Sequence, residues 1–159
     1  MRKVIGIGET ILDIIFKNEQ PTAAKPGGST FNSMITLGRL GVNTEFISEV
    51  GRDRLGKQIK EFLAENNVKA DNVYDYDGGK TALSLAFLDE NMNADYLFYK
   101  NDAAQKLDYV MPKIEENDII VIGSFFSIND ALRENLTYLL DEAKRKKAII
   151  YYDVNFRKN

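Results

Sequence analysis

Two adjacent glycines and an asparagine stand at the start of a helical pattern, and their types suit a polyhydroxylated ligand. Gly27 and Gly28 precede this pattern, and Asn32 follows one turn into it. Glycines let a ligand approach backbone amides at a helix N-terminus, and an amide side chain both donates and accepts hydrogen bonds. Glu9 and Asp13 lie beside apolar residues, where a carboxylate is more often a solvated edge residue or a helix-cap partner than a catalytic group.

The first glycine motif is a poor match to a dinucleotide site. Gly6 and Gly8 are followed by Ile11 at the position where a third glycine would allow close packing of helix and strand. Strand-like sequence comes next instead of a helix. A tight turn at a strand end is therefore the interpretation for these glycines. The chain also has no glycine loop ending in Lys-Ser or Lys-Thr, which excludes P-loop nucleotide hydrolysis by this segment.

Composition excludes several kinds of chemistry. The 159 residues include no Cys and no His, so disulfides, thiolate zinc sites, cysteine nucleophiles, serine-histidine triads and histidine-ligated metals are all absent. The formal charge of −3 gives no broad basic field, and nucleic acid is not an expected partner. No apolar run approaches the roughly 18 residues that span a bilayer. We expect one soluble, cytoplasmic unit with no membrane partner.

Short apolar runs alternate with helical patterns along most of the chain. Three helical patterns are present. The first begins after Ser29 or Thr30 as N-cap and ends at Gly41. The second begins after Arg54, and the third begins after Asn129 as N-cap. Repeated strand-helix-strand units predict an α/β fold with a parallel sheet and helices on its faces. The predicted strands of these units are 4–7, 44–50, 119–122 and 148–152.

Two further runs break the alternation and predict a second structural feature. Residues 81–89 and 94–99 are strand-like and are joined by the turn 90–93, so they should pair antiparallel. Residues 11–16 form another strand-like run. The simplest arrangement is an accessory flap or a small second sheet. After the strand 148–152 no helix follows, although ligands of open α/β sheets bind at the carboxyl ends of the strands. We therefore expect the chain to be part of a larger fold.

Several of these segments together resemble the N-terminal signature of the PfkB sugar kinases, the ribokinase-fructokinase family. The resemblance runs through nearly the whole chain in the family's order. It rests on Gly8-Glu9 with Asp13, on 27–33 with Gly38 and Gly41, on 49–56, and on 153–157.

The resemblance implies a ribokinase-like α/β fold, with 1–159 as the N-terminal part of the domain. It implies transfer of the γ-phosphoryl group of ATP to a sugar hydroxyl with Mg2+. By position, Asp13 and Asn32 would bind sugar hydroxyls, while Gly27 and Gly28 would give close backbone contact. Strands near 11–16 and 81–99 would form a small lid that covers the sugar and excludes water.

Three further positions match the family by place. Lys100 stands where fructokinase-like and 2-keto-3-deoxygluconate-kinase-like members commonly carry an arginine, and it either binds a sugar oxygen or is a solvated charge. Asn155 and Arg157 would lie near the ATP phosphates, where a positive charge stabilises the transferred group. At the chain end, Arg157 is alternatively a mobile surface arginine.

The family's second signature, a Gly-Ala-Gly-Asp segment with the general-base aspartate, has no match in this chain. The general base is thus expected beyond Asn159, and the chain alone should be inactive. Three hypotheses stay open. The first is a sugar kinase, which the resemblance implies to be fructokinase-like or 2-keto-3-deoxygluconate-kinase-like. The others are a non-catalytic sugar-binding or interaction fragment and a nucleoside kinase of the same superfamily. The exposed face of a lid sheet would favour a homodimer.

Overall fold

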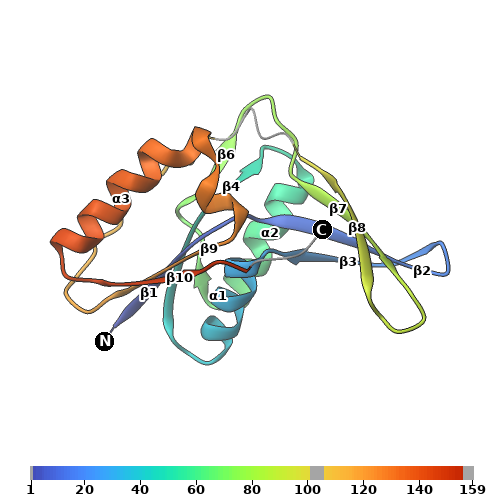
Figure 1. The fold of residues 1–159 in the computed structure, drawn as a ribbon, viewed down its shortest axis with the longest axis horizontal. Helices are drawn as coiled ribbons and strands as arrows, with labels where there is room; N and C mark the ends of the chain where they lie inside the picture. The colour runs from blue at the N-terminus through green and yellow to red at the C-terminus, as the bar shows by residue number, and fades with distance from the viewer. Residues whose placement is uncertain (1, 101–105, 156–159) are drawn as a thin grey trace.

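The computed structural model describes residues 2–100 and 106–155, and it contains a large parallel sheet and a smaller second sheet (Figure 1). The large sheet has the strand order β10-β9-β1-β4-β5, and β6 also pairs with β4. All of its pairings are parallel. The strands are β1 (Lys3–Ile7), β4 (Asn43–Gly51), β5 (Val68–Lys69), β6 (Val73–Tyr76), β9 (Ile119–Gly123) and β10 (Ile149–Asp153). The predicted α/β fold with a parallel sheet is confirmed.

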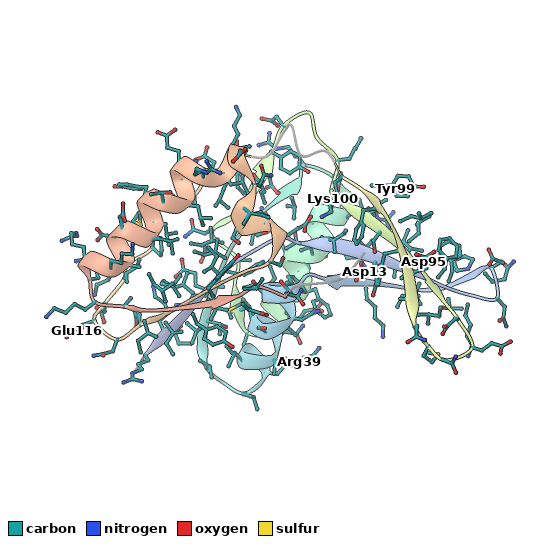
Figure 2. All side chains as sticks on the ribbon, in the orientation of Figure 1. Asp13, Arg39, Asp95, Tyr99, Lys100 and Glu116 are labelled. Carbon is teal, nitrogen blue, oxygen red and sulfur yellow. The ribbon has the colours of Figure 1, made fainter. Side chains whose placement is uncertain are left out.

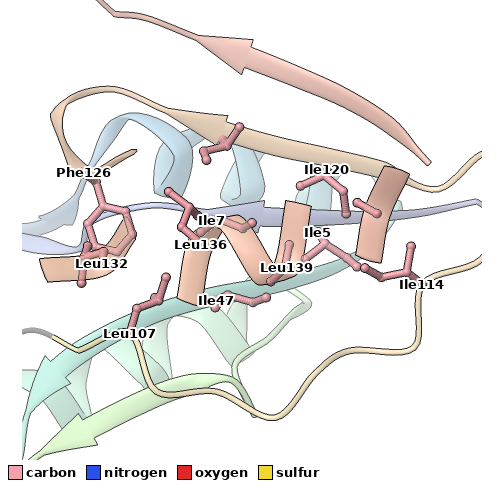
Figure 3. Packing of buried hydrophobic residues seen from close by; sticks show 12 residues of the cluster. Ile5, Ile7, Ile47, Leu107, Ile114, Ile120, Phe126, Leu132, Leu136 and Leu139 are labelled. Carbon is pink, nitrogen blue, oxygen red and sulfur yellow. The ribbon is translucent and has the colours of Figure 1, made fainter. Parts of the chain in front are cut away.

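Helices cover both faces of this sheet because its central strands are apolar on both sides. Side chains alternate along β1, so Val4 packs with α1 (Ser29–Arg39) and α2 (Arg54–Glu65) on one face. Ile5 and Ile7 are fully buried on the other face, against α3 (Arg133–Arg145). Figure 3 shows this second cluster, in which Leu136 and Leu139 of α3 lie over β1 and β9. The two cores fix the strands from both sides.

The second sheet has the order β3-β2-β7-β8 and is called the lid here. It consists of β2 (Ile11–Lys17), β3 (Gln20–Gly27), β7 (Leu83–Leu88) and β8 (Ala94–Tyr99). Two antiparallel hairpins, β2-β3 and β7-β8, are joined by parallel pairing of β2 with β7. The lid extends away from the body formed by the large sheet and its helices (Figure 1). The strands predicted near 11–16 and 81–99 are confirmed as parts of a small second sheet, and β3 joins them.

The ends of the helices differ in part from the prediction. The expected N-cap of α1 at Ser29 or Thr30 is wrong, because the capping position is Gly28, with φ of 133° and no side-chain hydrogen bond. Asn129 does cap, but its side chain accepts from Ala131 in a short 3-10 turn (η3, Asp130–Leu132) that leads into α3. A second such turn (η2, Phe125–Ile128) precedes it. Within the described ranges, no helix has the length and apolar character to cross a membrane.

Candidate functional site

The carboxyl ends of the parallel strands and the start of α1 meet at one edge of the large sheet. A Cβ atom placed on Gly8, just after β1, would lie 2.7 Å from Cβ of Thr30 in the first turn of α1. A Cβ atom on Gly123, at the end of β9, would lie 2.7 Å from the backbone oxygen of Asp153 and 3.3 Å from Oγ1 of Thr30. These glycines let the helix start against the strand ends, and ligands of open α/β sheets bind at this edge.

Gly27 and Gly28 pack directly against two acidic residues, Asp13 in β2 and Glu9 in the connection that precedes β2. A Cβ atom on Gly28 would lie 2.2 Å from the backbone oxygen of Glu9, and one on Gly27 would lie 2.6 Å from Oδ2 of Asp13. Residues other than glycine also rarely adopt the φ of Gly28. The structure therefore brings Gly27, Gly28 and Asp13 together, as expected from the sequence, and adds Glu9 to them.

Asp13 lies within the lid, at the end of β2 nearest the large sheet (Figure 2). It is opposite Ser84 in the register of β2 and β7, and Oδ1 of Asp13 accepts a hydrogen bond from the Ser84 hydroxyl. Oδ2 points toward Gly27, where it has no hydrogen-bond partner among the described residues. One carboxylate oxygen thus accepts from the protein, while the second has unused acceptor capacity among the described residues.

Lys100 follows β8 and forms an ion pair with Glu9, with Nζ 2.5 Å from Oε1. The two side chains are 27% and 20% exposed, so the pair is partly buried. Nζ also lies 5.1 Å from the centre of the Phe98 ring. Lys100 is therefore not a freely solvated charge. Its ion-pair partner Glu9 contacts Gly28 through its backbone, so Glu9 links Lys100 to the Gly27-Gly28 segment. Sequence reasoning did not pair these residues, since no local pattern links positions so far apart.

Asn32 lies one turn into α1 and is exposed. Its backbone N–H donates to the oxygen of Gly28, and its backbone oxygen accepts from the Thr36 hydroxyl. Across the described ranges, its side-chain amide has no protein partner. The amide is thus available to a ligand at the start of the helix.

Asn155 lies at the same edge of the sheet but two strands away from β1. Its N–H donates to Oδ1 of Asp153 at 3.0 Å, and its φ of 43° turns the chain after β10. Since adjacent strands are about 4.8 Å apart, β10 lies about 10 Å from β1. Asn155 therefore does not join the group around Asp13, and it belongs to a separate part of the strand edge. Arg157 lies outside the described residues.

Asp53 is an important polar residue to which sequence reasoning gave no role. It caps α2, with Oδ1 accepting from the N–H groups of Leu55 and Gly56 at 3.0 and 2.9 Å. The same carboxylate accepts from the hydroxyl and the N–H of Thr81, at 2.7 and 2.8 Å. Thr81 stands just before β7, so Asp53 joins the start of α2 to the base of the lid. An acidic residue two positions before a helical pattern is the signal that could have found the cap.

Glu49 on β4 is the second such residue. It is 4% exposed, and Oε2 accepts from the N–H groups of Lys106 and Leu107 at 3.1 and 2.9 Å. Oε1 is buried with no hydrogen-bond partner in the part of the chain that the structure describes. Burial raises the pKa of Glu49, although the two backbone hydrogen bonds oppose the shift. Glu49 holds the chain that returns from the lid against the large sheet.

The described carboxylates offer no protein cage for a metal ion. Across residues 2–100 and 106–155, no three Asp or Glu side chains gather in one place. Magnesium in phosphoryl-transfer sites is commonly held by one or two carboxylates together with phosphate oxygens and water. The residues present fit a role in binding a polar organic ligand, and we assign none of them to a metal.

The fold defines an α/β protein in which a small second sheet extends from the edge where the parallel strands of the large sheet end. A model of the pfkB family of carbohydrate kinases matches residues 1–159. The chain belongs to this family. The resemblance found in the sequence is thereby confirmed.

Individual relatives agree with this assignment. The chain is 28% identical to the probable chloroplastic fructokinase-6 of Arabidopsis thaliana, over 97% of this chain and 43% of that protein. It is 25% identical to an uncharacterized sugar kinase of Pyrococcus horikoshii in complex with ATP, with a TM-score of 0.76 over 97% of this chain and 53% of that one. A Vibrio cholerae fructokinase double mutant with fructose, ADP and potassium ion bound has a TM-score of 0.83 at 20% identity, covering 99% and 51% of the two chains, and shows the fold. The chain thus spans about half the length of these relatives.

Proposed function

We propose that the full-length protein is an ATP-dependent carbohydrate kinase and that this chain is the N-terminal part of its domain. The observation that carries the proposal is the junction at the base of the lid, where the Asp13 carboxylate lies against Gly27 and the Glu9 backbone lies against Gly28 at the start of α1. Membership of the carbohydrate kinase family supports the same activity. Fructokinases among the relatives favour a ketose, and a 2-keto-3-deoxy sugar acid is the second candidate.

In this proposal the residues of the chain bind and orient the sugar. The free oxygen of Asp13 accepts hydrogen bonds from sugar hydroxyls, and the exposed amide of Asn32 pairs with a neighbouring hydroxyl. Gly27 and Gly28 let the sugar approach the backbone at the start of α1. Lys100 donates from the lid side, and the lid excludes water, which would otherwise compete for the phosphoryl group.

The reaction then transfers the γ-phosphoryl group of ATP to the bound sugar. The sugar oxygen forms a bond to the γ-phosphorus, the bond from that phosphorus to the β-γ bridging oxygen breaks, and ADP leaves. The hydroxyl proton passes to a general-base carboxylate, which we place beyond Asn159. Asn155 and Arg157 are proposed to lie near the ATP phosphates. Mg2+ would neutralise charge on the phosphates during transfer.

The same proposal extends to assembly and location. Side chains of β8 expose apolar surface, with Leu97 at 49%, Phe98 at 58% and Tyr99 at 58% exposure. Such a surface on one sheet supports a homodimer formed through the lid. The sequence contains no cysteine, so its folding needs no oxidising compartment, and we propose a cytoplasmic location.

The direct test is sugar-dependent ADP formation by the full-length protein, with ATP, Mg2+ and a panel of sugars and nucleosides. The proposal expects turnover with a sugar. Turnover with a nucleoside alone would identify a nucleoside kinase instead. Sugar binding without ADP formation would identify a non-catalytic sugar-binding protein.

A further inference from the structure

A row of side chains crosses one face of the lid at the end that joins the body. Asp13 of β2, Ser84 of β7 and Phe98 of β8 stand opposite one another in the registers of these strands. Residues opposite one another on neighbouring strands point to the same face of a sheet. Ser84 lies in the middle of this row, and its exposed fraction is 0%. Ser84 therefore contacts its neighbours in the protein and has no surface open to a ligand.

The carboxylate of Asp13 is held from two sides. The Ser84 hydroxyl donates to Oδ1 at 2.5 Å, across the parallel pairing of β2 with β7. On the other side, a Cβ atom placed on Gly27 would lie 2.6 Å from Oδ2, so only a glycine there leaves room for this oxygen. The last torsion of an aspartate side chain has broad energy wells and does not by itself set the plane of the carboxylate. The hydrogen bond from Ser84 is thus the contact that sets this plane.

A fixed carboxylate binds a hydroxyl group better than a rotating one. A hydrogen bond weakens steeply when its angle departs from linearity, and an acceptor that is already oriented loses less entropy on binding. The single O–H donor of Ser84 is used on Asp13, so Ser84 acts on a ligand only through that carboxylate. Ser84 belongs to the second lid hairpin and Asp13 to the first. The orientation of the Asp13 carboxylate therefore depends on the pairing of the two hairpins.

We propose that Ser84 is a positioning residue, whose hydroxyl holds the Asp13 carboxylate in the orientation that presents Oδ2 to a sugar hydroxyl. The inference rests on the proposed kinase function and on the role of Asp13 in it. It assigns Ser84 no contact with the sugar and no part in phosphoryl transfer.

The experiment measures steady-state kinetics of the full-length protein with ATP, Mg2+ and the preferred sugar of the panel, with fructose tested first. Ser84→Ala should lower kcat/KM for the sugar about tenfold, since a hydrogen bond to a charged group is lost. The loss should lie mainly in KM for the sugar, and KM for ATP should stay within about twofold. Ser84→Cys keeps a weaker donor and should lose less than Ser84→Ala. The reverse order would overturn the inference.

A double-mutant cycle separates positioning from a general effect on the lid. In an Asp13→Ala background, Ser84→Ala should change kcat/KM for the sugar by less than about twofold, because no carboxylate remains to be held. An equal loss in both backgrounds would show that Ser84 acts independently of Asp13 and would overturn the inference. Unchanged kcat/KM in Ser84→Ala would overturn the role of Ser84 and leave the kinase proposal intact. No turnover of any sugar by wild type would overturn both.

Thr44→Val is the matched control. Thr44 is 1% exposed, and its hydroxyl donates to the backbone oxygen of Asn67 at 3.3 Å. It lies near the amino end of β4, away from the edge that carries the candidate site. The substitution removes one buried hydroxyl donor, as Ser84→Ala does, and should leave kcat/KM for the sugar within about twofold of wild type. A loss as large as in Ser84→Ala would show that any buried hydroxyl has this effect and would overturn the specific role of Ser84.

Discussion

At the scale of single residues, Gly28 is a position where the start of α1 closely approaches the connection after β1. Its φ is 133°, and a Cβ atom there would lie only 2.2 Å from the Glu9 backbone oxygen, so the position has room for glycine alone. We expect Gly28→Ala to lower the free energy of unfolding by more than about 3 kcal/mol, because backbone strain and a backbone clash add. Urea unfolding of the purified protein measures this.

Gly41 provides the control for this substitution. Its φ is 78°, but a Cβ atom there would meet nothing within 4 Å. Gly41→Ala should therefore lose only the conformational term, about 1–2 kcal/mol. Equal losses in the two variants would contradict the close approach at Gly28.

Asp13 is the residue on which sugar binding most depends in the proposed function. Asp13→Asn removes the charge that strengthens hydrogen bonds to sugar hydroxyls, worth about 1.5–3 kcal/mol. We expect kcat/KM of the full-length protein for its sugar to fall by roughly 10- to 100-fold at that energy. Steady-state kinetics of ADP formation measures the loss. Asp95→Asn, at an exposed position of β8, is the control and should leave kcat/KM within twofold of wild type. If Asp95→Asn lowered kcat/KM as much as Asp13→Asn, a specific role of Asp13 would be contradicted.

At the scale of elements, Asp53 joins helix α2 to the base of the lid. Burial alone would raise the pKa of Asp53, but hydrogen bonds from Thr81, Gly56 and Leu55 together hold it below its ordinary value of 3.8. A carboxylate with a lowered pKa in the folded state stabilises the fold above its unfolded-state pKa. This contribution is lost as the pH falls through the folded-state pKa.

We therefore expect Asp53→Asn to lower the free energy of unfolding by about 1–2 kcal/mol at pH 7. The difference from wild type should shrink as the pH falls below 3.8. Urea titrations at pH 7 and pH 3 measure both. Asp77→Asn, which removes an exposed ion pair with Arg52, should change stability by less than about 1 kcal/mol. A loss in Asp53→Asn that is the same at both pH values would contradict the role of its charge.

The elements also show what the sequence could predict. The strands β7 and β8 were predictable because their strand-like residues flank a turn. The strand β3 was not, because Pro21, Pro26 and the polar residues between them give no apolar alternation. Proline is tolerated in β3 because this strand lies at the edge of the lid.

The candidate site divides in the same way. Gly27 and Gly28 were found from their residue type before a helical pattern, and Asp13 was assigned through the family resemblance; the structure places the Asp13 carboxylate beside Gly27. The contact of Glu9 with Lys100 depends on how the lid pairs with itself across a long stretch of chain. Tertiary packing alone determines this contact, so no local signal could reveal it.

At the scale of the whole molecule, the edge strand β10 has side chains exposed on both faces. Tyr151 is 61% exposed and Tyr152 is 48% exposed, although neighbouring side chains of a strand point to opposite faces. Strands of parallel sheets are normally covered on both faces. Since the chain spans about half the length of its relatives, we propose that the rest of the full-length protein covers β10.

This proposal predicts that the 159-residue chain forms no ADP in response to a sugar, whereas the full-length protein does. The physical reason is that the general base is proposed to lie beyond Asn159. A coupled assay of ADP formation, run on both proteins at the same concentration, measures the difference. Sugar-dependent turnover by the 159-residue chain would place the base within it and overturn the proposal.

The parallel seam between β2 and β7 also determines the order in which the molecule can fold. Each lid hairpin is local in sequence, yet Asp13 and Ser84, which are paired across the seam, are 71 positions apart. An isolated hairpin is marginal in water, so neither half of the lid gains lasting order until the seam closes. Closing it requires β4 and α2, which lie between the two hairpins, to dock first, since their docking shortens the loop that must be closed. We therefore expect the lid to be the last region to acquire protection from hydrogen exchange during refolding.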